Sequence, residues 1–207
     1  MGRTKNFASV NFSALSHIAL RRTGLGLVAL SFSLMIAPAR AQADELFAIV
    51  TDKSSVTYTL VHKLHTVHGV AKKGLEAKAK ISATGAQLAI RIPVSNFDSG
   101  NGNRDEHMQE TVEAAKFPNV DIKAVIPDAK VQASGESQVT LKGKLTFHGI
   151  TQDVQIPLTL SWSGPKQVGV KGKFIVSLDG YKVERPSLLG MKVEDNIEIE
   201  IDLQMAE

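Results

Sequence analysis

The chain has no cysteine, one tryptophan and two tyrosines among its 207 residues. Without cysteine it has no disulfide framework, no thiolate metal site and no cysteine nucleophile, so the fold depends on its hydrophobic core. Familiar enzyme motifs are missing too, since there is no G-x-S-x-G, no H-E-x-x-H and no P-loop. We therefore expect neither an enzyme nor a cofactor.

The body of the chain also lacks a basic surplus. The formal charge of +3 comes from the first 43 residues, which hold Arg3, Lys5, Arg21, Arg22 and Arg40 and no acid. Without these five, the 24 bases become 19 against 21 acids, and the net charge becomes −2. A weakly acidic body has no electrostatic footprint for a phosphate backbone, so we expect no nucleic-acid partner.

The N-terminal segment has the pattern of a secretory signal peptide. Arg21 and Arg22 precede the apolar run Gly24–Ala37, and small residues then offer cleavage near Ala41 or Ala43. The run of 14 residues is shorter than the roughly 20 that cross a bilayer, which favours a cleaved signal over a membrane anchor.

This pattern divides the chain into two parts. Residues 1–43 are predicted to be the signal peptide, and residues 44–207 are predicted to be one mature domain. We expect that domain in the periplasm, without a membrane span.

From Val56 onward the sequence alternates apolar and polar residues, which is typical of strands with one buried face. The alternating segments are Val56–Leu64, Leu75–Ile81, Leu88–Val94, Val120–Ile126, Val139–Phe147, Val154–Trp162, Val168–Val176 and Ile197–Met205. Short glycine turns between several of them predict an antiparallel meander. Closure into an eight-stranded up-and-down barrel leaves no exposed edges, so we favour this all-β fold over a two-sheet sandwich of the same periodicity.

Two interruptions of the strand pattern, 96–116 and 179–194, are long enough to hold helix. In the first, Asn103 and Glu106 fit an N-cap and its capping-box partner. The apolar stripe that would face the sheet consists of Met108, Val112 and Ala115. We expect one helix of about three turns near the mouth of the barrel.

The most polar cluster, Asn103–His107, opens this helix. Arg104 and His107 lie on nearly one side, where they and the free N–H groups of the first turn could contact an anionic or carbonyl head group. Asp105 and Glu106 also suit the positive end of the helix dipole, which is a purely structural role. Both interpretations stay open at this point.

Three histidines, His62, His65 and His68, form an H-x-x-H-x-x-H pattern. On one strand His62 and His68 would point to one face and His65 to the other, so at most two could share a metal ion. Further ligands would have to come from His107 or His148, or from carboxylates such as Asp105. The alternative is that one histidine lies at the barrel mouth and the others are solvated at a strand end.

The order of several segments resembles the YceI-like family of secreted polyisoprenoid-binding proteins. The matching segments are Ser55–His62 with Val67–Gly69, Ile92–Ser95, Gly102–Met108, Lys116–Pro118, Leu145–Thr151 with Val154–Leu158, and Arg185–Pro186. The Arg-Asp-Glu-His and His-Gly-Ile-Thr pieces are the most specific, and their order and spacing agree with the family.

The resemblance implies a lipocalin-like barrel with a long apolar tunnel for a polyprenyl or quinone-type chain, and no catalytic role. It implies that Arg104, Asp105 and His107 shape the loop and helix at the pocket mouth. It also implies that His62 and His148 occupy positions where the family tends to have histidine.

Inward-facing positions and polar residues near the mouth together give the predicted ligand contacts. These are Tyr58, Leu60, His62, Phe97, Arg104, His107, Met108, Phe117, Phe147, Leu160 and Trp162. The leading hypothesis is a non-enzymatic periplasmic protein that binds, stores or transports an amphiphilic isoprenoid. Two alternatives stay open, a histidine-based metal-binding protein and a ligand-free stress-response barrel, and so does a homodimer.

Overall fold

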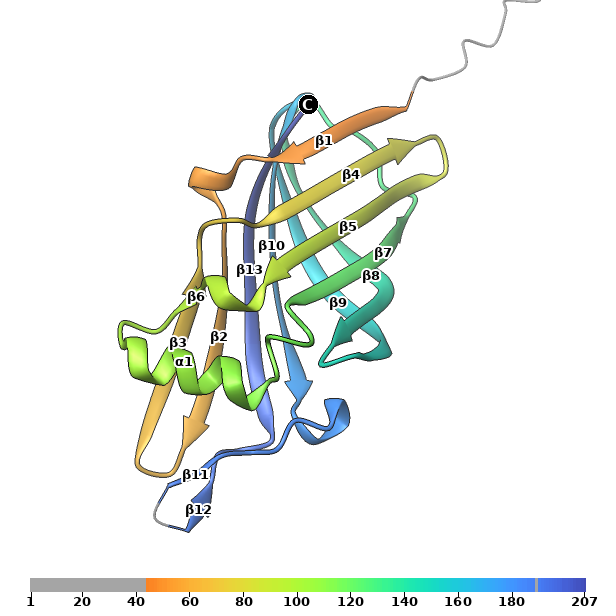
Figure 1. Ribbon diagram of the computed structural model, residues 1–207. Coiled ribbons are helices and arrows are strands. Elements are labelled where there is room, and N and C mark those ends of the chain that lie inside the picture. The colour runs from red at the N-terminus through yellow and green to blue at the C-terminus, as the bar shows by residue number, and fades with distance from the viewer. Residues whose placement is uncertain (1–43, 189) are drawn as a thin grey trace, which may run out of the picture. The chain divides into compact units, whose positions relative to one another are not determined.

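The computed structural model describes residues 44–188 and 190–207, so the predicted signal peptide lies outside the described residues. This part of the chain is mostly strand, with one α-helix and short 3₁₀ turns (Figure 1). The strands are β1 (Glu45–Ile49), β2 (Ser55–His62), β3 (His65–Ala71), β4 (Glu76–Ser82), β5 (Gly85–Pro93), β6 (Phe97–Asp98), β7 (Asn119–Pro127), β8 (Gly135–Phe147), β9 (Ile150–Gly164), β10 (Gln167–Ser177), β11 (Ser187–Leu188), β12 (Met191–Lys192) and β13 (Asn196–Ala206). The helix is α1 (Gly102–Thr111), and the turns are η1 (Thr51–Lys53), η2 (Val94–Asn96) and η3 (Asp179–Tyr181).

Eight strands close into an antiparallel barrel, which confirms the predicted fold class. Around the wall the order is β1, β4, β5, β7, β8, β9, β10 and β13, and every neighbouring pair is antiparallel. The ring closes because β13 pairs back onto β1 through Ala48↔Ala206 and Ile49↔Met205. Closure satisfies the backbone groups that a two-sheet sandwich would leave at its edges.

A shorter wall extends one end of the barrel. The first part of β13, Glu198–Asp202, pairs with β2, and β3 and β6 continue outward from β2. The strand predicted from Val56 is β2, so it belongs to this extension, and β1 takes its place in the ring. The alternation did not predict β1 or β3, because Leu46 puts an apolar residue on the exposed face of β1 and Gly69 replaces an inward side chain on β3.

The strands β9 and β10 separate partway along their length. They pair as far as Leu158↔Gly172, and the next residue of β9, Pro157, has no backbone N–H to continue the ladder. Beyond this point the two strands diverge (Figure 1). We call the part of the barrel around Phe47 and Trp162 the closed half, and the part beyond Gly172 the splayed half.

The closed half is filled with side chains. The rings of Phe47 and Trp162 meet edge to face with their centroids 5.9 Å apart. On the same stretch of β9, β10 and β13, Leu160, Val168 and Leu203 are also buried. This is the dense packing that an eight-stranded barrel reaches when large inward residues meet across its axis.

In the splayed half, the segment 178–183 lies where β9 and β10 no longer pair. Three hydrogen bonds tie it to β8, β9 and the turn between them: Gln152 Nε2 to the Gly180 carbonyl (2.6 Å), His148 Nδ1 to the Tyr181 carbonyl (2.9 Å) and the Tyr181 hydroxyl to the Leu145 carbonyl (3.4 Å). On its other side, the Asp195 carboxylate accepts the Asp179 N–H and the Ser177 hydroxyl, both at 2.7 Å. The described residues of the interruption at 179–194 form a 3₁₀ turn and the paired strands β11 and β12, and none of them is in an α-helix.

The helix α1 lies in front of the splayed half and connects β6 to β7 (Figure 1). Its N-cap is Asn101, whose backbone is extended and whose side chain accepts the Arg104 N–H at 3.2 Å. The predicted cap at Asn103 is therefore wrong, because that residue is already helical. The helix ends at Thr111, so Ala115 lies beyond it. Among the described residues, no helix combines the length and hydropathy needed to cross a bilayer.

Candidate ligand-binding cavity

The splayed half encloses a cavity of about 180 Å³. A single water molecule needs about 10–15 Å³ on this scale, so the space admits roughly a dozen groups of that size or more. Strands β2, β3, β5, β6, β7, β8, β10 and β13, the helix α1 and the segment around residues 178–183 all contribute to its wall, together with Pro186 and Val193. Of the 25 lining residues 21 are apolar, which suits an apolar ligand.

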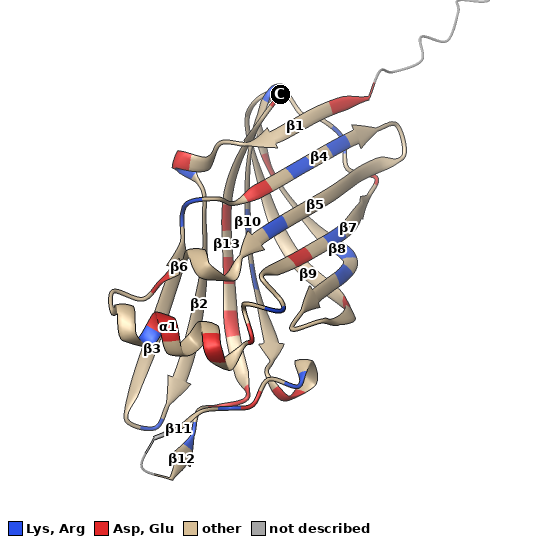
Figure 2. Ribbon diagram, viewed as in Figure 1, with Lys and Arg blue, Asp and Glu red and all other residues tan. Residues whose placement is uncertain are grey.

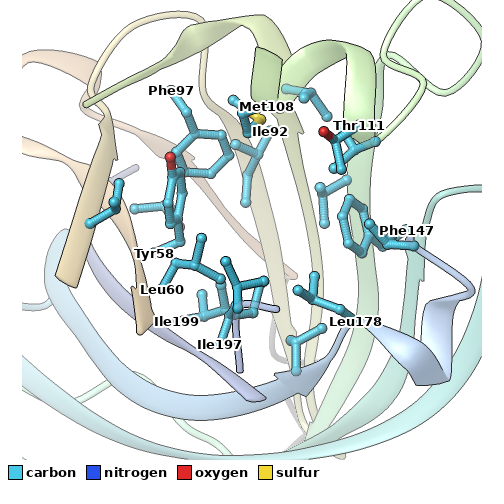
Figure 3. A pocket seen from close by; sticks show the side chains of 18 of the residues that line it. Tyr58, Leu60, Ile92, Phe97, Met108, Thr111, Phe147, Leu178, Ile197 and Ile199 are labelled. Carbon is cyan, nitrogen blue, oxygen red and sulfur yellow. The ribbon is translucent and has the colours of Figure 1, made fainter. Parts of the chain in front are cut away.

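The four lining residues with polar groups, Tyr58, Arg104, His107 and Thr111, gather at the helix. The last three are on α1, and Tyr58 reaches the same end from β2. Figure 3 shows the Tyr58 hydroxyl directed toward this end, with Met108 and Thr111 reaching into the cavity from α1. The cavity is therefore amphiphilic, with polar groups under the helix and apolar side chains deeper in the barrel.

Tyr58 is fixed by its neighbours. Its ring packs edge to face on Phe97, with centroids 5.3 Å apart, and lies so close over Gly69 that a Cβ there would overlap it. Burial raises the pKa of the Tyr58 phenol, the charge of Asp105 raises it further, and Arg104 lowers it. The phenol is therefore neutral at physiological pH and available as a hydrogen-bond donor.

Arg104 is held by the loop that precedes the helix. Its Nε donates to Ser99 Oγ and its Nη2 to the Ser99 carbonyl, both at 2.8 Å. The Ser99 hydroxyl in turn donates to Asp105. Within the described part of the chain, Nη1 of Arg104 has no hydrogen-bond partner. The two bonds to Ser99 fix the orientation of the guanidinium, so Nη1 can donate to a ligand at the rim of the cavity.

His107 and Thr111 contribute less to a fixed site. The His107 side chain is 68% exposed, and its Nδ1 lies 3.6 Å from Glu110 Oε2. The Thr111 hydroxyl donates to the His107 carbonyl at 2.8 Å, so only its oxygen lone pairs face the cavity as acceptors. His107 therefore sits at the solvent edge of the polar end.

The structure brings seven of the predicted contacts together around the cavity. These are Tyr58, Leu60, Phe97, Arg104, His107, Met108 and Phe147. Leu160 and Trp162 instead lie in the closed half, where they are buried among packed side chains. Phe117 lies beyond the end of α1 and packs edge to face on His148, with centroids 5.0 Å apart. Alternation identifies the inward face of a strand, but it does not show which half of that face borders open space.

His62 also lies away from the cavity, and the predicted arrangement of the three histidines is wrong. The chain turns between His62 and His65, which therefore pair across the β2–β3 hairpin with ring centroids 5.2 Å apart. His68 is on the opposite face, where its Nδ1 lies 2.9 Å from Thr59 Oγ1. Among the described residues, no three His, Asp or Glu side chains are grouped to hold a metal ion.

The buried His62 instead joins two hairpins. Its Nδ1 accepts the Leu64 N–H at 3.2 Å, so its Nε2 carries the proton and donates to the Met191 carbonyl at 3.0 Å. These bonds link the β2–β3 and β11–β12 hairpins at the far end of the splayed half and give His62 a structural role.

Several lining residues were not among the predicted contacts. Phe174, Ile197 and Ile199 stand on predicted strands and could have been selected by their alternation alone. Others, including Leu178, Val183 and Val193, come from the segment between β10 and β13, whose sequence has no strand period. No local pattern in the sequence marks that segment as part of a cavity wall.

A closed eight-stranded barrel with an apolar cavity and a few polar groups at one end defines the class of small ligand-binding barrels. Within this class, the YceI-like domain model matches residues 47–205. The chain belongs to the YceI-like family, which confirms the resemblance found in the sequence.

Relatives by sequence are distant. A UPF0312 protein of Pseudomonas fluorescens is 27% identical over 123 residues, which are 56% of this chain and 62% of that protein. A UPF0312 protein of Pseudomonas savastanoi pv. phaseolicola is 20% identical over 190 residues, covering 86% of this chain and 96% of the relative.

Two solved structures share the fold. A polyisoprenoid binding domain from Saccharophagus degradans has a TM-score of 0.63 at 13% identity, covering 77% of this chain and 97% of that domain. BcnA of Burkholderia cenocepacia has a TM-score of 0.64 at 21% identity, covering 75% of this chain and 98% of BcnA.

Proposed function

We propose that this protein is a periplasmic, non-enzymatic carrier that binds one amphiphilic isoprenoid, of the polyprenyl or quinone type. The observation that carries the proposal is the cavity itself, with 21 apolar lining residues and four polar ones gathered at α1. That distribution matches a ligand with a long apolar tail and one polar head. The Saccharophagus degradans domain of the same fold is described as polyisoprenoid binding, which supports this ligand class.

The tail supplies most of the affinity. Each methylene moved from water into an apolar site contributes about 0.8 kcal/mol, so about ten such groups contribute about 8 kcal/mol before the cost of association. A cavity of about 180 Å³ has room for that number. A longer polyprenyl chain would have to widen the cavity or leave part of its length outside.

The head lies under α1. Arg104 and the neutral Tyr58 phenol both donate hydrogen bonds, so they suit a carbonyl, hydroxyl or phosphate oxygen. One hydrogen bond of this kind contributes about 0.5–1.5 kcal/mol, which is small beside the tail. Arg104 and Tyr58 therefore orient the ligand more than they retain it.

The periplasmic location follows from the predicted signal peptide at residues 1–43. In the periplasm, which lies between two membranes, a water-insoluble isoprenoid crosses the aqueous space only when an apolar cavity shields it from water.

Native mass spectrometry of the protein, expressed from the full-length chain and purified from the periplasm, tests the proposal. We expect a near-stoichiometric mass that solvent extraction identifies as an isoprenoid. Leu60→Trp, which fills the cavity from β2, should lower the bound lipid at least tenfold. Ile175→Trp adds the same ring on the outer face of β10, where Ile175 is 57% exposed, and should leave the lipid content unchanged.

A protein that is bare on purification and stays bare after incubation with isoprenoids would contradict the carrier proposal. Equal lipid content in Leu60→Trp and wild type would place the lipid elsewhere on the protein. Thermal unfolding of both tryptophan variants shows that each is folded when its lipid content is compared.

A further inference from the structure

The outer wall formed by β1, β4, β5, β7 and β8 concentrates basic side chains. We call it the lysine face. Its exposed lysines are Lys78, Lys80, Lys123, Lys142 and Lys144, and they border one shallow hollow on the outside of the barrel. Figure 2 shows these basic segments on the side of the barrel where β4, β5 and β7 lie. Residues 44–207 have a net charge of −2, so this concentration is local.

The strand register brings two of these lysines together. Lys123 on β7 is directly opposite Lys144 on β8, and Lys142 is opposite the apolar Val125. Like charges in directly opposed positions destabilise a sheet. The fold alone gives no reason to place Lys123 opposite Lys144.

On the wall formed by β10 and β13, by contrast, Lys171 and Lys173 each have an acidic partner. There Lys171 pairs with Asp202 at 3.1 Å, and Lys173 pairs with Glu198 at 3.0 Å. On the lysine face, Lys80 and Lys144 have acidic partners, Asp44 and Asp153. Among the described residues, Lys78, Lys123 and Lys142 have no carboxylate within 4.0 Å.

Apolar side chains lie between the lysines. Leu46 is 63% exposed and lies directly opposite Lys80, and Val125 is 48% exposed and lies directly opposite Lys142. The small residues Ala48 and Ala89 lie opposite Lys78 on its two sides. A surface of exposed apolar side chains ringed by lysines fits the boundary of an anionic bilayer, where apolar groups enter the headgroup layer and ammonium groups remain at the phosphates.

We propose that the lysine face docks this protein on an anionic phospholipid membrane. The choice of a membrane over an acidic protein rests on the proposed function, because an isoprenoid carrier must collect or deliver its cargo at a bilayer. Glu106 and Glu110 on α1 are exposed and carry the opposite charge. An anionic surface attracts the lysine face and repels the helix, so the two regions together set the docking orientation.

Vesicle co-sedimentation tests the proposal with a matched pair of variants. Wild-type protein is mixed with vesicles of phosphatidylglycerol and phosphatidylethanolamine, and separately with neutral phosphatidylcholine vesicles, at low and high salt. We expect binding to the anionic vesicles alone, weakened by salt. A lysine near an anionic surface contributes about fivefold in affinity, so Lys123→Gln with Lys142→Gln should weaken binding roughly 25-fold. Lys171→Gln with Lys173→Gln makes the same change in net charge on the other wall and should weaken it less than twofold.

Stability separates this role from a structural one. Removing Lys123 relieves its repulsion with Lys144, so the Lys123→Gln, Lys142→Gln variant should unfold at the same temperature as wild type or slightly higher while its vesicle binding falls. Equal loss in both double variants, or equal binding to anionic and neutral vesicles, would overturn the proposal. Binding to polyglutamate without binding to vesicles would also overturn it and would indicate an acidic protein partner.

Failure of the docking proposal and failure of the carrier proposal give different experimental results. Lipid extracted from the Lys123→Gln, Lys142→Gln variant at the wild-type amount supports a docking role distinct from cargo binding. If the wild-type protein binds anionic vesicles but contains no isoprenoid, the docking proposal is supported and the proposal that the cargo is an isoprenoid is contradicted.

Discussion

The two halves of this barrel have the same types of inward-facing residues, but in one half these residues form a packed core and in the other they line a cavity. In the closed half, the buried rings of Phe47 and Trp162 meet edge to face across the interior. In the splayed half, β9 and β10 part after Leu158↔Gly172, and the inward residues line a cavity of about 180 Å³. One half therefore stabilises the fold and the other offers a site for an apolar ligand. The comparison shows that the pairing of two strands, more than side-chain type, decides where the barrel is hollow.

The largest expected effect is a loss of stability in the closed half. Trp162→Ala removes a ring that is 5% exposed, and we expect a loss of about 3–5 kcal/mol in the free energy of unfolding. Phe174→Ala, in the splayed half, removes a half-buried ring that already borders the cavity, and we expect a loss of about 1 kcal/mol. Denaturant unfolding of both variants measures the difference. Equal losses would break the distinction between the two halves.

A second prediction concerns the polar end of the cavity. Gly69→Ala forces the Tyr58 ring away from β3, and we expect a loss of about 1–3 kcal/mol in unfolding free energy because the ring has no equivalent position. Tyr58→Phe keeps the ring in place and removes the hydroxyl, so it is the matched control and should leave stability nearly unchanged. Unaltered stability in Gly69→Ala would show that Tyr58 is free to move.

Arg104→Ala should have a smaller effect, confined to the ligand. In the proposed complex the guanidinium donates one or two hydrogen bonds to the head, so we expect isoprenoid affinity to fall about three- to tenfold while the stability of the barrel is unchanged. Titration with a soluble short-chain isoprenoid measures this ratio. A loss as large as that caused by Leu60→Trp would mean that the head, and not the tail, dominates binding.

The smallest predicted effect is a dependence on pH in the segment that closes the splayed half. The hydrogen bonds from the Asp179 N–H and the Ser177 hydroxyl lower the pKa of Asp195 below its ordinary value. The stabilisation is therefore complete above that ordinary value, about 3.9, and is lost as the pH falls through the lower pKa of the folded protein.

Thermal unfolding of wild type and Asp195→Asn measures this contribution. Asp195→Asn should unfold at a lower temperature than wild type at pH 7, and the gap should narrow as the pH falls below about 4. A gap that is constant with pH would mean that the hydrogen bonds do not depend on the charge of Asp195.

Alternation along the strands predicted the barrel and seven of its eight ring strands, and it missed β1. The predicted contacts Tyr58, Leu60 and Phe147 line the cavity because each stands on an inward face in the splayed half. Leu160 and Trp162 share an inward face on β9 but do not line the cavity, because the position of the hollow depends on the separation of β9 from β10. Pro157 within a predicted strand is the one local sign of that separation. It indicates a missing backbone hydrogen bond between strands, but it does not show which half of the barrel becomes hollow.

Other parts of the site depend on contacts between distant segments. The cavity wall around Leu178 and Val183 is held by hydrogen bonds to β8, β9 and the turn between them, and to Asp195, none of which a periodic pattern encodes. The histidine pattern failed for a related reason. The turn between His62 and His65 reverses the chain, so residues assumed to share one strand lie on two.

A methyl NMR titration with a short-chain isoprenoid tests most directly the claim that the splayed half binds the ligand while the closed half supports it. Isoleucine and leucine methyl groups report on both halves of the same molecule. We predict shifts at Ile92, Leu178 and Ile199, which line the cavity, and unchanged signals at Leu160 and Leu203 in the closed half. Shifts of equal size in both halves, or shifts confined to the closed half, would contradict the account.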